Sequence, residues 1–451
     1  MTQQLEQLPM SDQKKSPSEA KAVVALKSVG CRTNQEEMTA LAFSLSGHGF
    51  DITQAIDRAD IIIVNSCSVT SCSESKTRRL VHSIARKAPL AQICVTGCLA
   101  QQQGSELLEL PNVCWVVGNR HKDHISHIIQ SSEKGLFVSP VADITQLRAP
   151  EPMSTAVWQG RTRFPLKIQE GCNFNCSYCI VPSLRGPSRS AEHHTLYTRC
   201  EEAVASGFKE IVITGTHIGQ YAADGAADLP KLLQRLLGVD GDYRIRLSSL
   251  DPRDLSDELL DLVGNEKKMC RHVHISVQSF SAEVLKAMHR PYRDLEKLIE
   301  RIKRFRQDCS DAGLGGDFIV GFPGETDTQF RHTLEAIKEI GFTYGHVFRF
   351  SKRPGTPAAA MKHQIASSIK KKRSEALRDH LAAQQQRFIQ RCKNSPQTII
   401  VEKEKPVYGV TSNYIRVELP QLRAPKNSWQ QVLLSGEKTA GGRWEAILSE
   451  D

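Results

Sequence analysis

Short apolar runs alternate with longer amphipathic stretches in the first third of the chain. The runs occupy residues 23–26, 61–64, 93–96 and 115–117, and a helical pattern follows each of the first three. Strands that alternate with helices predict a parallel sheet joined by right-handed crossovers. We therefore expect an N-terminal parallel-sheet α/β domain over residues 21–133, preceded by a polar tail at residues 1–20.

The middle of the chain repeats this alternation, with helical patterns between successive apolar runs. The runs lie at residues 166–168, 211–213, 245–247, 273–277, 318–320 and 346–348. Six strand–helix units fall short of the eight that close a full barrel. The pattern predicts an open (βα)6 partial barrel over residues 158–388, connected to the first domain by a linker at 134–157.

The last part of the chain changes to short strands separated by turn residues. Its apolar runs lie at residues 398–401, 408–410, 414–419, 431–434 and 444–448. Five short strands over residues 389–451 predict a small β-barrel, an architecture that commonly binds oligonucleotides. Tyr408 and Tyr414 are either stacking partners for bases or aromatic residues of the core and strand faces, and we favour the second interpretation slightly.

Length and cysteine content are typical of a multidomain enzyme from a reducing compartment. A chain of 451 residues is too long for one ordinary core. It contains no apolar stretch that suits a secretory signal or a membrane span. Thirteen cysteines do not suit a secreted disulfide framework, because the number is odd. We expect a cytoplasmic monomer that has no membrane partner and binds metal through some of its cysteines.

Positive charge is concentrated in one segment of the chain. The formal net charge is +9, and the segment from Lys352 to Lys393 has eleven Lys or Arg against two acidic residues. Such a segment favours a polyanionic partner such as RNA. The alternative is a solvated helix face, since residues 368–391 have a helical pattern.

Three cysteines lie close together at Cys172, Cys176 and Cys179. A closed tetrahedral zinc site requires four ligands. Three ligands suit a 4Fe-4S cluster that keeps one iron open to another molecule. The alternatives are a zinc site with a distant fourth ligand and three unrelated buried thiols.

Three other cysteines each follow a different predicted strand of the first domain: Cys31, Cys67 and Cys98. The carboxyl ends of parallel strands share one edge of the sheet, which is where such folds bind ligands. We therefore expect these side chains to converge on a second cluster. Cys72 lies at the start of a helix and is left out, while Cys94 and Cys114 lie inside predicted strands.

Polar and glycine-rich segments follow the predicted strands of the barrel, at residues 214–216, 248–249, 278–279 and 321–325. This edge is the chemical face of a barrel, where glycine lets a ligand approach the backbone closely. Arg290 can pair with a carboxylate or phosphate, although a surface position is the more common one for arginine. We assign no role to four histidines near strand ends, namely His217, His272, His274 and His289.

The spacing of Cys172, Cys176 and Cys179, with an aromatic residue before the third, resembles the signature of the radical S-adenosylmethionine enzymes. In that family the open iron chelates the amino and carboxylate groups of the methionine moiety. The three domains together resemble the methylthiotransferases, whose last domain is the RNA-binding module TRAM. Similar segments lie at residues 30–34, 64–70, 95–98 and 351–357, and residues 68–78, 186–190 and 346–348 resemble the threonylcarbamoyladenosine tRNA branch.

This resemblance implies two 4Fe-4S clusters and bound S-adenosylmethionine. Cys31, Cys67 and Cys98 would hold the second cluster, and the cofactor pocket would be lined by Thr214, Gly215, Ser248, Gln278 and Arg290. By resemblance, a 5′-deoxyadenosyl radical removes hydrogen from carbon 2 of the base, the second cluster holds the sulfur, and a second S-adenosylmethionine supplies the methyl group.

The implied substrate is threonylcarbamoyladenosine at position 37 in the anticodon loop of tRNA, with an unidentified electron donor and sulfur donor. The alternatives are a methylthiotransferase for isopentenyladenosine or for a ribosomal protein, and a non-catalytic RNA-binding protein that contains zinc. One residue departs from the family pattern, because Phe280 stands where the family often has glycine or alanine.

Overall fold

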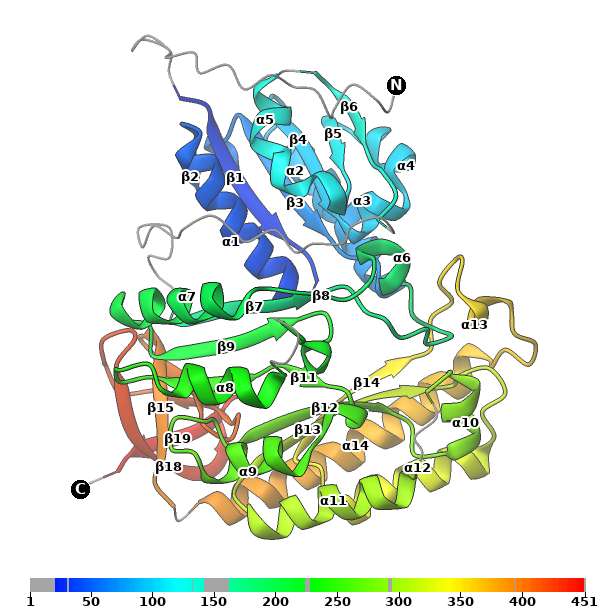
Figure 1. The fold of residues 1–451 in the computed structure, drawn as a ribbon, viewed down its shortest axis with the longest axis vertical. Helices are drawn as coiled ribbons and strands as arrows, with labels where there is room; N and C mark the ends of the chain where they lie inside the picture. Colours follow the sequence, from blue (N-terminus) through cyan, green and yellow to red (C-terminus); the bar gives the residue numbers. More distant parts are fainter. Residues whose placement is uncertain are drawn as a thin grey trace.

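The computed structural model describes residues 21–30, 32–131, 133–141, 162–223, 228–290, 294–393 and 395–449. Figure 1 shows a first α/β domain, coloured blue to cyan, above a barrel coloured green to orange, with a small red β-barrel beside the lower part. The predicted fold class is confirmed for all three parts. No helix in the described part of the chain is both long and apolar enough to cross a membrane.

The first domain is built on a six-stranded parallel sheet in the order β2-β1-β3-β4-β5-β6. Its strands are β1 (Val23–Ser28), β2 (Asp51–Thr53), β3 (Ile61–Ser66), β4 (Gln92–Gly97), β5 (Val113–Val117) and β6 (Gly135–Phe137). Its helices are α1 (Arg32–Gly47), α2 (Ser71–Lys87), α3 (Cys98–Gln102), α4 (Gly104–Leu108) and α5 (Ile125–Gln130), with short 3-10 turns η2 (Ile56–Arg58) and η3 (Asn119–His124).

Apolar side chains cover both faces of this sheet. Helices α1 and α5 pack against one face through residues such as Leu45 and Ile125, and α2 and α3 pack against the other through Val81 and Leu99. Because both faces of the sheet are covered, β3 is buried at every position, including Asn65 and Ser66 at its end. A strand buried on both faces has a continuous apolar run, as residues 61–64 do.

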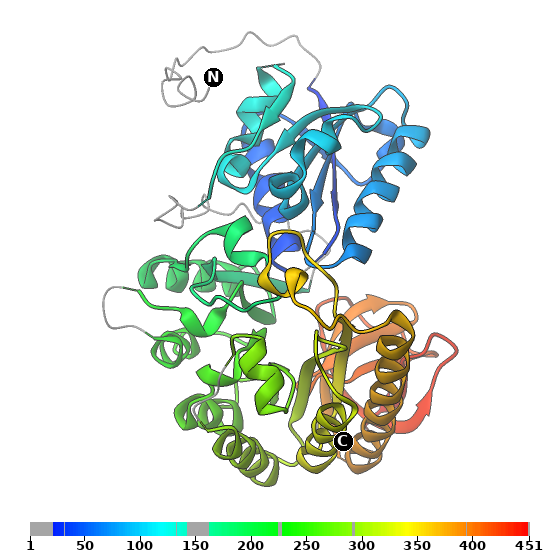
Figure 2. The same ribbon diagram turned by 90° about the vertical axis from the view of Figure 1, so that its right-hand side faces the viewer.

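The second part is an open barrel made of two four-stranded sheets, ordered β10-β9-β7-β8 and β11-β12-β13-β14. Its strands are β7 (Arg163–Glu170), β8 (Arg189–Ser190), β9 (Glu210–Gly215), β10 (Arg244–Leu247), β11 (Ser249–Leu250), β12 (His272–Gln278), β13 (Gly313–Val320) and β14 (Tyr344–Arg349). All pairings are parallel except that of β8 with β7. Because β8 and β14 are both edge strands, the barrel stays open between them (Figure 2).

Helices surround the outside of this barrel and cover its apolar face. They are α6 (Val181–Arg185), α7 (His193–Ala205), α8 (Leu229–Leu237), α9 (Asp257–Asn265), α10 (Ala282–Ala287), α11 (Leu295–Asp308), α12 (Asp327–Ile340), α13 (Pro357–Ala360) and α14 (Ser367–Cys392), with turns η5 (Ile218–Gln220) and η6 (Pro252–Asp254). Alternate strand residues, for example Val273, Ile275 and Val277 of β12, belong to the core under these helices. The intervening residues therefore face the barrel interior.

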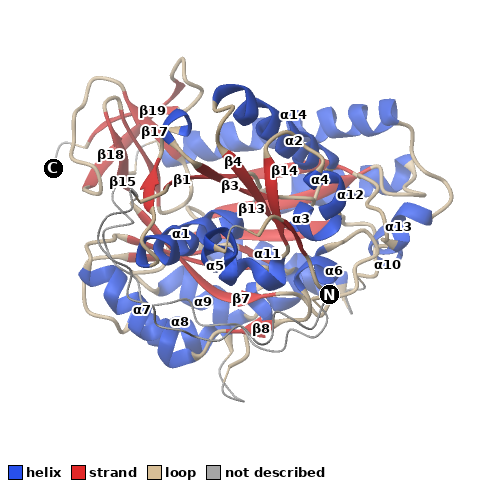
Figure 3. Cartoon of the chain, turned by 90° about the horizontal axis from the view of Figure 1, so that it is seen from above, coloured by secondary structure: helices blue, strands red, loops and turns tan. Residues whose placement is uncertain are grey.

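The C-terminal part is a closed barrel in the order β15-β16-β17-β19-β18. Its strands are β15 (Gln397–Glu404), β16 (Val407–Thr411), β17 (Arg416–Leu419), β18 (Trp429–Lys438) and β19 (Trp444–Leu448). It packs beside the end of the larger barrel at which β9 and β10 begin, where Arg244 and Arg246 donate hydrogen bonds to its carbonyl oxygens (Figure 3).

Buried charges fill the larger barrel at this junction. Glu210 of β9 lies 2.7 Å from Arg244 and 2.8 Å from Arg246, and its side chain is fully buried. Burial raises the pKa of Glu210, but the neighbouring arginines outweigh it and hold the pKa well below its usual range. The two strands thus begin in a paired ionic layer at this end of the barrel.

Candidate active site

The cysteine triplet lies in the loop that leaves the carboxyl end of β7. The loop turns at Gly171, where φ is 77° and a Cβ would stand 1.9 Å from the carbonyl oxygen of Pro187. Only glycine fits such a position, because the backbone is left-handed and the space is already filled. The amide of Cys179 then donates to the carbonyl of Cys176 at 3.0 Å, which folds the loop back on itself.

Three thiols come from this one short loop. A closed tetrahedral zinc site needs four ligands, whereas three suit a 4Fe-4S cluster that keeps one iron open. Among the described residues, the metal-binding side chains whose ligand atoms all lie within 4.8 Å of one another are His274, Asp317 and His346.

The thiol of Cys179 loses its proton only with difficulty. Burial raises its pKa to about 12, and the neighbouring thiols of Cys172 and Cys176 contribute to the increase. A positively charged metal centre deprotonates such a thiol when it binds. The donor set therefore fits an iron–sulfur cluster and does not fit a nucleophilic cysteine, whose pKa would be lowered.

Two charged residues outside the strands contact the triplet, one after β9 and one after α10. Nδ1 of His217 lies 3.5 Å from Sγ of Cys172, and its Nε2 lies 2.5 Å from Asp254. Arg290 approaches Sγ of Cys176 at 3.6 Å. His217 was assigned no role from the sequence, and its contact with Asp254 joins residues that are 37 positions apart.

The residues predicted to line the cofactor pocket lie around the same rim. Thr214 and Gly215 end β9, Ser248 lies between β10 and β11, Gln278 ends β12 with φ of 71°, and Arg290 follows α10. Arg290 is also paired with Asp251 at 2.6 Å and donates to the carbonyl of Ser276 at 2.7 Å.

Two hydroxyl groups at this rim fit a polar ligand. Oγ of Ser248 and Oγ1 of Thr216 are buried, and neither has a hydrogen-bond partner among the described residues. A buried hydroxyl without a partner is costly, and a bound polar molecule removes that cost. The rim thus offers two hydroxyl groups to a polar ligand.

Phe280 does not obstruct this rim, despite its size. Its side chain is 5% exposed and belongs to the core under the helices, where its ring lies 6.2 Å from that of Phe342. Its amide donates to Oγ1 of Thr333. The departure from the family pattern is therefore accommodated in the core, away from the barrel interior.

The other predicted cysteine set lies at the facing edge of the first domain. Cys67 follows β3 and Cys98 begins α3 after β4, and both side chains are 4% exposed. The preceding residues, Ser66 and Gly97, are paired directly across the two strands. Cys31 lies outside the described residues.

Gly30 approaches Cys67 closely. Its φ is 120°, and a Cβ added there would stand 3.1 Å from Sγ of Cys67. The end of β1 and the end of β3 therefore lie side by side at this edge. By contrast, Cys72 is exposed on α2, and Cys94 lies in the core of β4.

The two cysteine-bearing edges are in direct contact. Cys98 packs against Ile180 and Leu184, which follow the triplet in the chain. Nδ2 of Asn119 donates to the carbonyl of Leu184 at 2.8 Å and lies 4.0 Å from Sγ of Cys98. The strand ends of the first domain thus face the rim of the open barrel.

The segment 351–357 also connects the two edges. Arg353 forms an ion pair with Glu74 of α2 and donates to the carbonyl of Ser68, next to Cys67. At the end of the segment, the amide of Ala358 donates to the carbonyl of Ser177 in the triplet loop, at 2.8 Å. From the sequence, this segment is similar to the corresponding segment of the methylthiotransferases, but no contact of it could be predicted.

A buried ionic network lies beneath the same contact. Glu37 of α1 lies 2.6 Å from Lys122 and 2.6 Å from Arg185 of α6, and Arg185 also contacts Glu170 at 2.7 Å. Burial raises the pKa of Glu37, but Arg185 and Lys122 outweigh burial and hold the pKa well below its usual range. Arg185 follows the triplet by six residues, so the network fixes the loop to the first domain.

Family models match two parts of the chain. The model described as the radical SAM superfamily matches residues 166–337, and the model described as uncharacterized protein family UPF0004 matches residues 23–118. A radical S-adenosylmethionine methyltransferase, TsrM, from Kitasatospora setae superposes with a TM-score of 0.58 at 16% identity, covering 75% of this chain and 77% of that chain. The fold and the triplet define a radical S-adenosylmethionine enzyme.

Curated relatives identify the family within the radical S-adenosylmethionine enzymes. The threonylcarbamoyladenosine tRNA methylthiotransferase MtaB of Bacillus subtilis is 35% identical, covering 88% of this chain and 90% of the relative. The MtaB protein of Thermotoga maritima is 36% identical, covering 87% of this chain and 89% of the relative. A tRNA-2-methylthio-N(6)-dimethylallyladenosine synthase of Fusobacterium nucleatum is 32% identical over 77% and 81%. The chain belongs to the MtaB family of methylthiotransferases, radical enzymes that transfer a sulfur-containing group.

Proposed function

We propose that this enzyme methylthiolates carbon 2 of threonylcarbamoyladenosine in the anticodon loop of tRNA. The observation that carries the proposal is the contact between the two cysteine-bearing edges, where Cys98 packs against Ile180 beside the triplet. The substrate itself is taken from the names of the relatives in Bacillus subtilis and Thermotoga maritima.

We assign Cys172, Cys176 and Cys179 to one 4Fe-4S cluster and Cys31, Cys67 and Cys98 to a second. Thr214, Gly215, Ser248, Gln278 and Arg290 line the pocket for S-adenosylmethionine. Once bound, these groups supply the radical that opens an unactivated C–H bond and the sulfur that replaces the hydrogen, which side chains alone cannot do. The two edges around them enclose the reaction and limit the access of water.

The residues around the triplet orient its ligands. His217, held by Asp254, contacts Cys172, and Arg290, held by Asp251, contacts Cys176. Partners of this kind fix the direction of a metal ligand and tune its electron density. Arg290, which is also paired with Asp251, would place its guanidinium beside a bound cluster, where it would stabilise the negative charge of the reduced form.

The basic segment supplies a surface for the tRNA backbone. Nζ of Lys370 donates to the carbonyl of Phe350 at the end of β14, so the start of α14 lies near the barrel rim. Burial lowers the pKa of Lys370, and the nearby charges of Lys352 and Arg349 lower it further. Crowded positive charges of this kind attract phosphate groups.

Removal of the gene and mass spectrometry of the tRNA nucleosides test the proposal directly. We expect the 2-methylthio derivative of threonylcarbamoyladenosine to disappear and its unmethylthiolated precursor to accumulate. Loss of the isopentenyl derivative in its place would assign the enzyme to the other tRNA branch. An unchanged nucleoside profile would leave the ribosomal protein as the alternative substrate.

The cofactor content distinguishes the enzyme from a zinc-containing RNA-binding protein. Anaerobically purified protein is expected to be brown and to contain about eight irons per chain if both clusters are cubanes. A colourless protein that contains zinc would contradict the proposal.

A further inference from the structure

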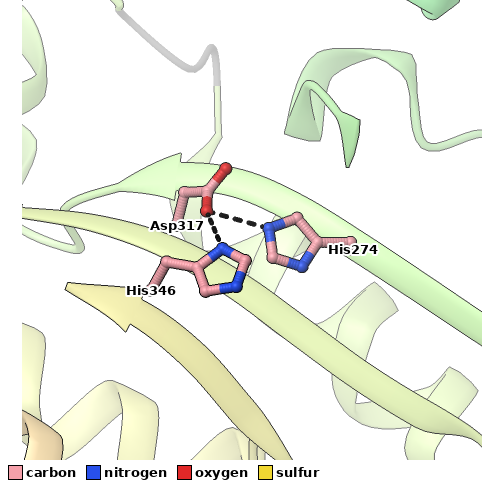
Figure 4. Close-up of side chains that lie close together, drawn as sticks. All are labelled: His274, Asp317 and His346. Atoms are coloured by element: carbon pink, nitrogen blue, oxygen red, sulfur yellow. Dashed lines mark hydrogen bonds and ion pairs between the residues drawn. The ribbon is translucent and has the colours of Figure 1, made fainter. Parts of the chain in front are cut away.

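A polar group made of His274, Asp317 and His346 lies on three adjacent strands, β12, β13 and β14. Nε2 of His274 lies 2.9 Å from Oδ1 of Asp317, and Nδ1 of His346 lies 3.0 Å from the same oxygen. Figure 4 shows both imidazole rings reaching the same oxygen of the carboxylate. Burial raises the pKa of Asp317, but the two histidines outweigh burial and lower it, so the group is a carboxylate at neutral pH.

The group faces the interior of the open barrel. On β14, Val347 belongs to the core under the helices, so the alternate residues Tyr344, His346 and Phe348 face the other way. Because β14 is an edge strand, this face remains accessible: the side chain of His346 is 57% exposed and Phe348 is 42% exposed. An exposed imidazole and an exposed aromatic ring thus lie two residues apart on one face.

The group also lies in line with the predicted cofactor pocket. Along the interior face of β12, His274 is followed by Ser276, whose carbonyl accepts from Arg290, and then by Gln278. A strand rises by about 3.3 Å per residue, so His274 lies about 13 Å from Gln278. This spacing is about the size of a substituted nucleoside, with one end at the cofactor and the other at the histidines.

The imidazole of His346 is held in a fixed orientation. Its Nδ1 is bound to Asp317, which leaves Nε2 for a ligand. His274 supports the carboxylate from the other side and is itself held by the hydroxyl of Tyr344, at 2.8 Å. The exposed nitrogen is therefore a positioned hydrogen-bonding group, and its neighbour Phe348 offers a flat ring of the kind on which unpaired bases stack.

We propose that His346, oriented by Asp317, recognises the polar substituent on the N6 atom of the substrate base while Phe348 stacks on the purine. The inference rests on the proposed function, because it requires a modified adenine in the barrel. A threonylcarbamoyl substituent contains a hydroxyl, a carboxylate and urea groups, so it can bond to an imidazole nitrogen whether that nitrogen donates or accepts. An isopentenyl substituent has none of these groups and would leave the imidazole without a partner.

The expected selectivity follows from the imidazole of His346, which an isopentenyl group would leave without a partner. A site built to form a hydrogen bond rejects an analogue that lacks the polar group, because the bound base covers the imidazole and leaves it without a bond. For one such bond the discrimination is about tenfold to a hundredfold. His346 is thus a specificity residue that separates the two tRNA branches of the reaction.

Binding of two RNA stem–loops to the anaerobically purified full-length protein tests the inference. The stem–loops are identical except for a threonylcarbamoyl or an isopentenyl group on the target adenosine, and their dissociation constants are measured by fluorescence anisotropy. We expect wild-type protein to prefer the first by at least tenfold, and His346→Phe and His346→Ala to lose that preference. Asp317→Asn should weaken the preference, because the imidazole is no longer held.

His332→Phe is the matched control, since it makes the same change on the exposed surface of α12. It should keep the wild-type preference, and the iron content of all variants should be equal. The inference is overturned if the His346 variants retain the preference. It is also overturned if wild-type protein contains one equivalent of a divalent metal that His346→Ala loses, because the three residues would then be a metal site.

The proposed function fails separately. It fails if wild-type enzyme does not methylthiolate a tRNA that carries threonylcarbamoyladenosine, as measured by mass spectrometry of the product. If the His346 variants still methylthiolate that tRNA and still prefer the threonylcarbamoyl stem–loop, the proposed function stands and only the recognition role of His346 is contradicted.

Discussion

Glu37 lies within 2.6 Å of two cations that come from different parts of the chain, Lys122 and Arg185. The carboxylate is nearly inaccessible to water, with 5% of its side chain exposed. A buried charge pair adds little stability over apolar residues of the same size, but the loss of one partner leaves the others uncompensated. At the residue scale, the junction between the first domain and the barrel therefore depends on this one side chain.

Glu37→Gln is expected to destabilise the protein by about 3–5 kcal/mol, because the buried Lys122 loses its paired carboxylate and the buried Arg185 is left with Glu170. The thermal unfolding midpoint, followed by circular dichroism, measures the effect. Glu106→Gln is the control, since the pair of Glu106 with Arg78 is on the surface and 63% of the Glu106 side chain is exposed. Its effect should stay below about 1 kcal/mol. Equal shifts in the two variants would contradict the importance of the buried network.

The cysteine assignments predict different iron contents for single variants. Cys176→Ala should lose the iron of the radical cluster and abolish turnover, and Cys98→Ala should lose the iron of the second cluster. Cys72→Ala should keep both, because Cys72 is exposed on α2. Iron and sulfide analysis of anaerobically purified protein measures these outcomes. A loss of iron in Cys72→Ala would show that the second ligand set is assigned wrongly.

The candidate site could be predicted only in part, for a reason that is visible in single residues. Cysteine spacing and position after strands are local signals, and they identified the six cysteines as candidate ligands. The contact of His217 with Asp254 spans 37 positions, and that of Arg185 with Glu37 spans 148. No local pattern marks such pairs, because folding alone brings their partners together.

At the element scale, the local sequence pattern predicts the central strands of the first sheet but not its edge strands. The long apolar runs of β3 and β4 are buried on both faces and were predicted correctly. The strands β2 and β6 have three residues each and few buried positions, so their patterns are too short to recognise. Strand β6 pairs with β5 and lies in the segment predicted as a linker, so the sheet extends to Phe137.

The segment at residues 351–357, which follows β14, is the basis of a prediction at the element scale. Arg353→Lys is expected to reduce turnover severalfold without loss of iron, because the single nitrogen of lysine cannot replace the three of Arg353. Nη1 of Arg353 contacts Glu74 and the carbonyl of Ser68, while Nη2 and Nε hold its own segment through Ser351 and the carbonyl of Lys352. Arg304→Lys, which makes the same change on the exposed surface of α11, should leave turnover nearly unchanged. Turnover per iron measures both variants. A loss of iron in Arg353→Lys would show that the segment holds the clusters in place and does not merely align the two edges.

At the scale of the whole molecule, the C-terminal barrel is joined to the larger barrel by buried charges. Glu210, Arg244 and Arg246 form the layer, and Arg163 extends it to Glu402 of β15. Because Glu210 has a lowered pKa in the folded protein, its contribution to stability is fully present above the unfolded value of about 4.3 and is lost as the pH falls towards the folded value.

Glu210→Gln is therefore expected to lower the thermal midpoint strongly at neutral pH and much less in acid. The difference between wild type and variant should be constant above about pH 5 and should shrink below about pH 4. Scanning calorimetry across this range measures the difference. A difference that does not change with pH would mean that the carboxylate contributes through packing and not through its charge.

The arginines of this layer reach the C-terminal barrel through its main chain. Arg244 bonds to the carbonyls of Thr398 and Val410, and Arg246 bonds to those of Thr411 and Ser412. Every residue type provides a carbonyl, so these contacts do not depend on which side chains that module has at these positions. A lineage could in this way replace the surface that meets its RNA, and so acquire new substrates, without rebuilding the catalytic barrel beneath it.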